Sequence, residues 1–240
     1  MVTLKTVLSA AFEQHEINKE NSVVFGSGVI AGKTFHILGV EEETYLGIRE
    51  CLVMSEKLIK ILESKSKNPL FLLVDVAGQK LSRQDEWLAM NQYFAQILAC
   101  LSCLRHQGTK LISLVYNQAI GGAFLAYGLM ADTILALPQA KIAVMWLEAM
   151  SRITKISLKQ LKGLSKYSPV FAPGIENFSR LGGINEVVAL SALKTKLLQQ
   201  AEQACTQDLR AKLAYEREGR KFAYPVIRKM LAKSCTNGIN

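Results

Sequence analysis

Residues 111–131 read LISLVYNQAIGGAFLAYGLMA and contain no charged side chain. The first part, 111–116, is a short apolar run with β-branched residues, which is typical of a strand buried on both faces. Asn117 to Gly122 follow as a polar turn that ends in two glycines, and residues 123–131 are rich in the helix formers Ala, Leu and Met. The stretch therefore predicts a strand that becomes a helix through a glycine turn.

Such a turn predicts an anion site made of main chain. The first N–H groups of a helix lack partners within the helix, and the helix dipole favours negative charge there. Glycine lets a ligand oxygen approach without meeting a Cβ atom. A membrane span is disfavoured because Asn117 and Gln118 lie at the middle of the run and a glycine pair follows. Another alternative stays open, namely a buried βα unit whose glycines serve only close helix–sheet packing.

The composition indicates a folded protein with an excess of positive charge. The chain has 240 residues, half of them hydrophobic, which is enough for one sizeable core and argues against disorder. The net charge of +9, from 29 basic and 20 acidic residues, favours an acidic partner or serves solubility alone. No run of Lys and Arg with interleaved aromatic residues marks a nucleic-acid surface, so no nucleic-acid partner is expected.

The cysteines and the N-terminal residues are typical of a cytoplasmic protein. The five cysteines have no regular spacing and do not form a disulfide framework. Cys100 and Cys103 form a CxxC pair, but no second pair follows at zinc-site spacing, so no metal site is expected. Charged residues occur too early for a secretory signal. The sequence therefore predicts a reduced, cytoplasmic protein that is not bound to a membrane.

Helix and strand patterns on either side of the central stretch predict one α/β sheet. A second doubly buried strand, 69–76, ends in Ala77, Gly78 and Gln79, at the sheet edge where ligands bind in α/β folds. We expect this loop to lie beside the glycine turn, since an oxyanion site needs two converging donors. The other expected elements are helices at 4–20, 41–63, 83–105, 152–166 and 184–198, a β hairpin at 22–40, and strands at 132–138 and 141–145.

The domain organisation is expected to be simple. No internal repeat and no long linker composition indicate an independent second domain. The expectation is a single α/β domain at 22–200, preceded by an N-terminal helical arm at 1–21 and followed by a C-terminal helical extension at 201–240.

Several motifs in a fixed order resemble the carboxyltransferase branch of the crotonase-like superfamily. The family pattern has a strand that ends in Asp-x-x-Gly, a Gly-x-Pro before the next strand, a Gly-Gly-Ala turn, and an Asp that begins the following strand. Downstream, AMSRITKISLKQLKGL and PVFAPGIENFSRLGG are similar to the γ subunit of biotin-independent malonate decarboxylase. The general resemblance covers 22–144 and the more specific one extends to about residue 188. The matching residues are Asp75, Gly78, Gly108, Gly121, Gly122, Ala123 and Asp132, with Lys110 in place of the proline.

This resemblance implies a crotonase-like ββα superhelix and a role in a carboxy-lyase complex. In that family the chain pairs with a homologous β subunit, and the active site between them decarboxylates a malonyl thioester on an acyl carrier protein. The thioester belongs to a dephospho-coenzyme A type of prosthetic group on the carrier, while this chain binds no cofactor directly and no biotin is involved. By position, Gly121 and Gly122 become the catalytic main-chain donors, and Ala77, Gly78 and Gln118 become substrate-binding residues.

Departures from the family pattern limit the expected chemistry. Crotonase-type hydratases place a catalytic Glu shortly after the glycine turn, but residues 123–126 read AFLA, so hydration and isomerisation are not expected. The Ser that proteases of this fold need at the helix start is missing too. Glu148 is interpreted as a surface or salt-bridged residue. Two alternatives stay open: the carboxyltransferase subunit of a biotin-dependent acyl-CoA carboxylase, and a non-catalytic scaffold subunit of the same fold.

Overall fold

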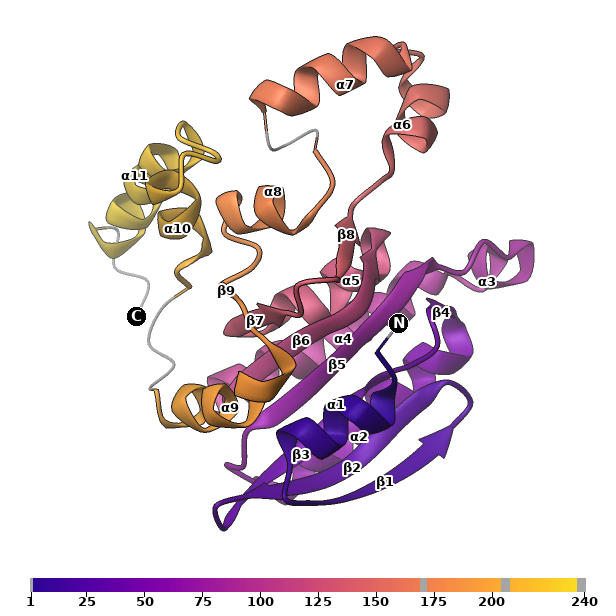
Figure 1. Cartoon of the computed structure of the whole chain (residues 1–240), viewed down its shortest axis with the longest axis vertical. Coiled ribbons are helices and arrows are strands. Elements are labelled where there is room, and N and C mark those ends of the chain that lie inside the picture. Colours follow the sequence, from indigo (N-terminus) through magenta and orange to yellow (C-terminus); the bar gives the residue numbers. More distant parts are fainter. Residues whose placement is uncertain (1, 169–171, 204–207, 237–240) are drawn as a thin grey trace. The chain divides into compact units, whose positions relative to one another are not determined.

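The computed structural model describes residues 2–168, 172–203 and 208–236 and contains a mixed β-sheet (Figure 1). Over these residues the sheet has nine strands in the order β1-β2-β3-β5-β6-β7-β9, while β4 pairs with β5 and β8 pairs with β6. The central strands β5 and β6 are parallel, whereas β1, β2 and β3 pair in antiparallel fashion. The bounds are β1 Gln14–Glu20, β2 Val23–Ile30, β3 Lys33–Val40, β4 Thr44–Leu46, β5 Leu70–Gln79, β6 Leu111–Ile120, β7 Thr133–Ala136, β8 Lys141–Ala143 and β9 Glu186–Val187.

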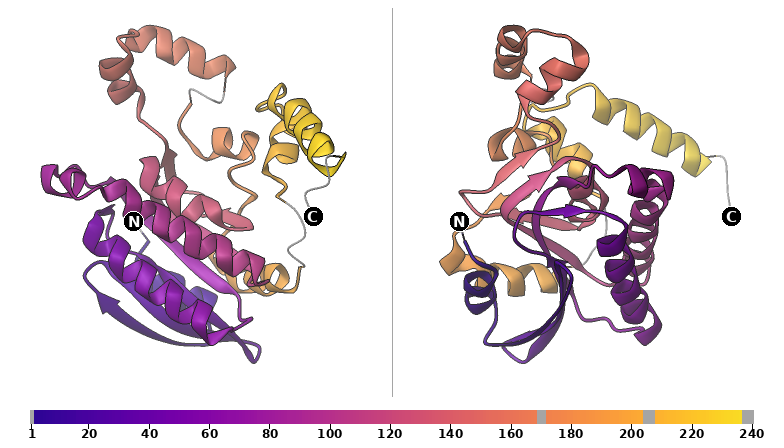
Figure 2. Two further views of the ribbon diagram at one scale, coloured as in Figure 1. Left: turned by 180° about the vertical axis from the view of Figure 1, so that it is seen from behind. Right: turned by 90° about the vertical axis from the view of Figure 1, so that its right-hand side faces the viewer.

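Helices cover both faces of this sheet (Figure 2). α2 and α4 pack together on one face, and α1 and α9 lie on the other. None of the described helices has the length and apolar character needed to cross a bilayer. The helix bounds are α1 Leu4–Ala11, α2 Ile48–Ser64, α3 Arg83–Trp87, α4 Met90–His106, α5 Gly121–Ala126, η1 Gly128–Met130, α6 Leu147–Thr154, α7 Leu158–Tyr167, α8 Ile175–Arg180, η3 Leu190–Ala192, α9 Leu193–Glu202, α10 Arg210–Glu216 and α11 Ala223–Thr236.

The two apolar runs predicted as doubly buried strands are β5 and β6. Phe71 and Leu73 belong to the core cluster that α1 and α9 cover, whereas Leu70, Leu72 and Val74 alternate with them along β5, and all five have 0% exposure. Because side chains of a strand point alternately to opposite faces, a strand covered on both sides carries no polar repeat. The sequence prediction of these strands, and of the hairpin β2–β3, is confirmed.

Two of the predicted helices are shorter in the structure, because part of each predicted range forms a strand instead. The helix expected at 4–20 ends at Ala11, and Gln14–Glu20 pairs with β2 as the edge strand β1. Most residues of β1 are exposed, so a helix there would bury no apolar face, while strand pairing satisfies the backbone groups. The helix expected at 41–63 begins only at Ile48, because Thr44–Leu46 runs parallel to the end of β5 as β4.

A turn divides the long helix expected at 83–105 into α3 and α4. Ala89 adopts a left-handed conformation with φ of 57°, which ends one helix and begins the next. Trp87, the last residue of α3, is 78% exposed. A short strand and a 3-10 turn likewise shorten the helix expected at 184–198, since α9 begins at Leu193.

Contacts divide the chain into two compact units. The larger unit, residues 1–144 and 186–206, holds the sheet with α1–α5 and α9, and the smaller unit, residues 145–185 and 207–240, holds α6, α7, α8, α10 and α11. Arg217 organises part of the smaller unit, because its guanidinium donates to the carbonyl oxygens of Ser179, Ile184 and Asn185. The boundaries expected at 1–21, 22–200 and 201–240 stay a prediction, and residues 169–171 of the motif PVFAPGIENFSRLGG lie outside the described residues.

A buried carboxylate explains the Asp that begins β7 in the motif pattern. Asp132 has a side-chain exposure of 3%, and its Oδ1 lies 2.7 Å from Nε of Arg105 at the end of α4. Its Oδ2 accepts a hydrogen bond of 2.9 Å from the main-chain N–H of Leu111, the first residue of β6. One side chain therefore joins α4, β6 and β7, and its role is structural.

Replacing Asp132 with Ala is expected to lower the free energy of unfolding by about 3 kcal/mol, because it leaves a partly buried guanidinium and a main-chain donor without their acceptor. Urea denaturation of the purified chain measures this change. Lys60→Ala is the control, since it removes an exposed ion pair with Glu56 on α2 and should change stability far less. Equal urea midpoints for the Asp132→Ala and Lys60→Ala variants would contradict the structural role of Asp132.

Candidate functional site

A bulge in the central strand pair creates the candidate site. β5 and β6 stay in parallel register up to the pair Val74 and Val115, but the next pair is Val76 with Ala119. Asp75 therefore stands opposite residues 116–118, so β6 carries extra residues and its end is displaced along the sheet. Where the ladder is interrupted, main-chain groups need other partners.

The side chain of Asp75 supplies those partners. It is 1% exposed, its Oδ1 accepts a hydrogen bond of 3.2 Å from the Gln118 N–H, and its Oδ2 accepts one of 3.0 Å from Nδ2 of Asn117. Hydrogen bonds to a carboxylate are stronger than those between neutral groups, so they hold the bulge in one conformation. Asp75 thus fixes the start of the glycine turn, and its place in the Asp-x-x-Gly motif is structural.

The Asn117 amide extends this network to the N-terminal residues. Its Oδ1 accepts from the Val2 N–H at 3.1 Å, and its Nδ2 donates to the Val2 carbonyl oxygen at 2.9 Å. The amide therefore binds the backbone of Val2 through two hydrogen bonds while it donates to Asp75 with its other hydrogen. Val2 packs against the core cluster that α1 covers, and Val2, Asp75 and Asn117 line one pocket together with residues of α1.

Gly78 and Gly121 lie side by side, as expected from the sequence, but residues 77–79 and 117–120, which were expected as loops, belong to β5 and β6. A Cβ atom placed on Gly121 would lie 4.0 Å from the Cα of Gly78 and 3.7 Å from the carbonyl oxygen of Val144. Gly121 has φ of +66° and Gly78 has φ of +138°, conformations that other residues adopt at a cost. Backbone conformation, rather than lack of space, is the reason for glycine at both positions.

The glycines of the turn do not serve close packing, which separates two of the alternatives left open by the sequence. A Cβ atom on Gly122 would meet only Oε1 of Gln79, at 3.1 Å, which is the far end of a flexible side chain. At Gly128, by contrast, a Cβ atom would come within 2.8 Å of both Phe124 and Val74. Gly128 is therefore the glycine that close packing requires, and Gly122 is not.

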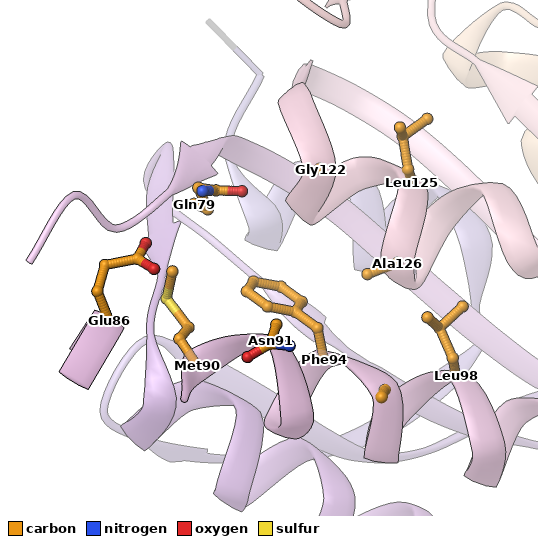
Figure 3. A pocket seen from close by; sticks show the side chains of 10 residues that line it. Gln79, Glu86, Met90, Asn91, Phe94, Leu98, Gly122, Leu125 and Ala126 are labelled. Atoms are coloured by element: carbon orange, nitrogen blue, oxygen red, sulfur yellow. The ribbon is translucent and has the colours of Figure 1, made fainter. Parts of the chain in front are cut away.

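A pocket of about 370 Å³ opens beside Gly122, between α4 and α5 (Figure 3). Because glycine has no side chain, Gly122 contributes main-chain atoms to its wall. Gln79 lies at the end of β5 next to Gly122, and apolar side chains of α4 and α5 form much of the remaining wall. No Lys or Arg is among the described residues that line it, namely Gln79, Glu86, Met90, Asn91, Phe94, Ala95, Leu98, Gly122, Leu125 and Ala126.

The structure places the other predicted site residues in different ways. Gly121 and Gly78 lie side by side, but of the residues assigned to the site only Gly122 lines this pocket. The Gln118 N–H is bonded to Asp75, so only the half-buried side chain of Gln118 remains for a substrate. Gln79 was not assigned to the site, although its place directly after Gly78 and the predicted strand could have indicated it.

Two buried tyrosines near the bulge act as structural anchors. The hydroxyl of Tyr116 donates to the Val40 carbonyl oxygen at 3.1 Å, and that of Tyr127 donates to the Leu73 carbonyl oxygen at 3.1 Å. Burial raises the pKa of both phenols above the usual value, with a smaller contribution from the charge of Asp75. Both therefore stay protonated near neutral pH and hold main-chain carbonyls.

Comparison with known proteins assigns the chain to a family. Residues 41–234 match the model of the malonate decarboxylase gamma subunit. The chain belongs to that family. The match includes β5, the glycine turn, the pocket and nearly all of the smaller unit. The resemblance deduced from the motifs is thus confirmed.

Relatives in sequence and structure agree with this family. The chain is 36% identical over 152 residues to the malonyl-S-ACP:biotin-protein carboxyltransferase MADD of Malonomonas rubra, a match that covers 60% of this chain and 52% of that protein. The chain thus spans about half the length of this relative. A subunit in the crystal structure of a Pseudomonas malonate decarboxylase hetero-tetramer with coenzyme A superposes with a TM-score of 0.83 at 22% identity, over 97% of this chain and 100% of that one.

The same comparison confirms the predicted fold class. Transcarboxylase 12S superposes with a TM-score of 0.69 at 20% identity, over 83% of this chain and 41% of that chain. The protein therefore has the crotonase-like carboxyltransferase fold, an α/β architecture with a mixed sheet and covering helices.

Replacing Asp75 with Ala is expected to destabilise the larger unit by about 2–3 kcal/mol, because the Gln118 N–H and the Asn117 amide lose a buried acceptor. Asp75→Asn is the matched control, since it keeps one acceptor oxygen at nearly the same volume and should lose less stability. Chemical denaturation ranks the two variants, and hydrogen exchange at the Gln118 amide reports the bulge directly. Unchanged protection of that amide in Asp75→Ala would contradict the role assigned to the carboxylate.

Proposed function

We propose that the chain is the subunit of a malonyl-thioester decarboxylase that holds the malonyl carboxylate at its glycine turn. A homologous β subunit would complete the active site and cradle the thioester. The observation that carries this proposal is the main chain of Gly122 in the wall of a pocket, at a position where packing does not require glycine. The pocket also argues against a scaffold that has lost its chemistry.

The reaction needs strong hydrogen bonds to the thioester oxygen and only weak binding of the carboxylate. When the bond between the carboxylate carbon and the α-carbon breaks, carbon dioxide leaves and its bonding electrons pass to the thioester carbonyl, which becomes an enolate oxygen. Hydrogen-bond donors aimed at that oxygen bind the transition state more tightly than the ground state, and one such donor contributes about 3–4 kcal/mol. Protonation of the α-carbon, by water or by a side chain of the partner, then gives the acetyl thioester.

The carboxylate loses its charge in this step, so it should be held weakly. A Lys or Arg in contact with it would stabilise the reactant and oppose the reaction, whereas neutral peptide groups orient it at little cost. None of the described lining residues of the pocket is cationic, and its one acidic residue, Glu86, belongs to α3 rather than to the glycine turn. Because α5 has only six residues, the individual N–H groups of Gly121 and Gly122 matter more than a helix dipole.

The companion contacts come from the end of β5. Ala77, Gly78 and Gln118 do not line the pocket, so they would contact the substrate outside it, on the side where Gly78 lies beside Gly121. Gln79 is an addition to this set, because its side chain lies next to Gly122 in the pocket. The substrate would be a malonyl thioester carried by an acyl carrier protein on a dephospho-coenzyme A type of prosthetic group.

A second candidate function is transfer of the carboxyl group to biotin instead of its release. The 36% identity to the malonyl-S-ACP:biotin-protein carboxyltransferase of Malonomonas rubra favours it. In that reaction the same enolate chemistry frees the carboxyl group, and a biotinyl nitrogen accepts it. The two candidates differ in whether biotin is needed, which is a simple experimental distinction.

The role of the glycine turn is tested by Gly122→Ala in the complex with the partner subunit. The added methyl group enters the pocket beside Gln79 without a strained backbone, so we expect turnover to fall by about 100-fold while assembly persists. Release of carbon dioxide from a malonyl thioester measures the first quantity and co-elution with the partner the second. Gly32→Ala, in the β2–β3 turn, should retain turnover.

A double variant separates a simple clash from loss of the site. Gly122→Ala with Gln79→Ala removes the 3.1 Å contact that the new methyl group would make, so a clash alone would be relieved. Because Gln79 is itself assigned to the substrate, Gln79→Ala alone is the reference, and we expect turnover of the double variant to stay well below that of Gln79→Ala. Wild-type turnover in Gly122→Ala would overturn the assignment of the carboxylate to this turn.

Biotin dependence is tested with avidin. Under the first function, excess avidin should leave the rate of carbon dioxide release from a malonyl thioester unchanged. Under the second function, the reaction should stop on addition of avidin and should depend on a biotinylated acceptor protein. Prior saturation of avidin with free biotin is the control for non-specific inhibition.

A further inference from the structure

The excess positive charge of the protein is confined to the smaller unit. The larger unit contains fifteen basic and fifteen acidic residues, so its formal net charge is zero. The smaller unit contains fourteen basic and five acidic residues, which accounts for the whole net charge of +9. An even distribution would be expected if the excess served solubility alone, so the smaller unit is where an anionic partner should be sought.

Within that unit, the helical pair α6–α7 has the most one-sided charge. Residues 147–167 include five cationic side chains and a single acidic residue, Glu148. All five cations are exposed, and none takes part in an ion pair among the described residues. Many other lysines and arginines do so, for example Lys57, Lys60 and Lys196. The five cations are Arg152, Lys155, Lys159, Lys162 and Lys166.

Three of these cations form a row on α7. Lys159, Lys162 and Lys166 are spaced by three and four residues, so they fall within an arc of about 60° and span about 10 Å along the helix. Leu161, which is fully buried, lies on the other side of α7, so the row faces away from the buried side. The row therefore presents three charges in one direction.

The row destabilises the helix that carries it. Like charges at spacings of three and four residues repel, and Lys159 lies in the first turn, where the helix dipole disfavours a cation. The capping box of Ser157 and Gln160 supports that first turn, so α7 is held by capping in spite of its charges. An anionic surface placed against the row would relieve this repulsion.

Apolar side chains among the cations indicate a protein as the partner rather than a nucleic acid. Ile153 is 67% exposed, Leu164 is 42% exposed and Tyr167 is 87% exposed on the same helical pair. A protein surface can meet both groups, with carboxylates opposite the lysines and apolar side chains opposite these residues. A phosphate backbone offers only the charge.

We propose that α6–α7 is the docking surface for the acidic protein that delivers the malonyl thioester. The Lys159, Lys162 and Lys166 row would pair with a row of carboxylates about two helical turns long on that carrier. This proposal rests on the proposed function for the identity of the partner, whereas the cationic surface itself does not depend on it. Docking at this surface adds affinity for the carrier without contact with the reacting groups.

Charge reversal of the row in the assembled complex tests the proposal. The variant Lys159→Glu/Lys162→Glu/Lys166→Glu is compared with Lys159→Arg/Lys162→Arg/Lys166→Arg, which keeps the charge, and with Lys5→Glu/Lys60→Glu/Lys65→Glu, which makes the same charge change on the larger unit. Each is assayed with malonyl thioester on purified acyl carrier protein and with free malonyl-coenzyme A, at low and high salt. Direct binding of the unloaded carrier protein is measured in parallel.

We expect KM for the carrier-borne substrate to rise by about tenfold or more in the Glu variant at low salt, with kcat retained and the effect much smaller at high salt. The Arg variant and the larger-unit variant should behave like the wild type. KM for free malonyl-coenzyme A should be the same in all forms, which distinguishes loss of docking from misfolding.

Other outcomes overturn the proposal separately from the proposed function. Equal KM changes for both substrates, or unchanged carrier binding in the Glu variant, would remove the docking surface and leave the decarboxylase function standing. If the wild type turns over neither substrate but binds the carrier through the row, the decarboxylase function fails and the docking surface remains. Binding of a 20-base-pair DNA duplex to the row, with no carrier binding, would identify a nucleic-acid surface instead.

Discussion

The hydrogen bonds of the Asp75 carboxylate inside the central sheet are the constraint on which the candidate site depends. Two parallel strands without a bulge would keep one register up to their ends. Here β6 carries extra residues opposite Asp75, which shifts the register. The carboxylate replaces the missing ladder partner by accepting from the Gln118 N–H and the Asn117 amide. The glycine turn follows directly, so its position beside Gly78 is set by a buried charge rather than by the loop itself.

Three kinds of glycine occur at the end of β5 and along α5 and η1, and they show how space and conformation can be separated. Gly121 and Gly78 need positive φ, Gly128 needs room for Phe124 and Val74, and Gly122 needs neither. Its main chain instead forms part of a pocket wall next to Gln79. A glycine that neither backbone conformation nor packing requires indicates a functional position. This observation is stronger evidence of function than the match of Gly122 to a sequence motif.

The sequence was sufficient for the central part of the fold because burial on both faces leaves an uninterrupted apolar run. β5 and β6 were predicted for that reason, the hairpin β2–β3 was predicted from two β-rich runs separated by glycines, and the motif order indicated the family. Local patterns failed where tertiary pairing decided the outcome: Gln14–Glu20 became an edge strand through pairing with β2, and Ala89 interrupted a helix whose apolar spacing was continuous. The approach of Gly78 to Gly121 could be predicted from parallel topology, but the pocket beside Gly122 depends on the distance between α4 and α5, which no local pattern encodes.

The amide of Asn117 joins Val2, which precedes α1, to the central strand β5. Val2 is held by Asn117, Asn117 by Asp75, and Asp75 by the main chain that precedes the glycine turn. Any displacement of Val2 therefore pulls on the middle of the sheet through three successive contacts. The segment before α1 is therefore tied to the strand end that leads into the glycine turn, so loosening that segment would be felt inside the sheet as well as at the surface.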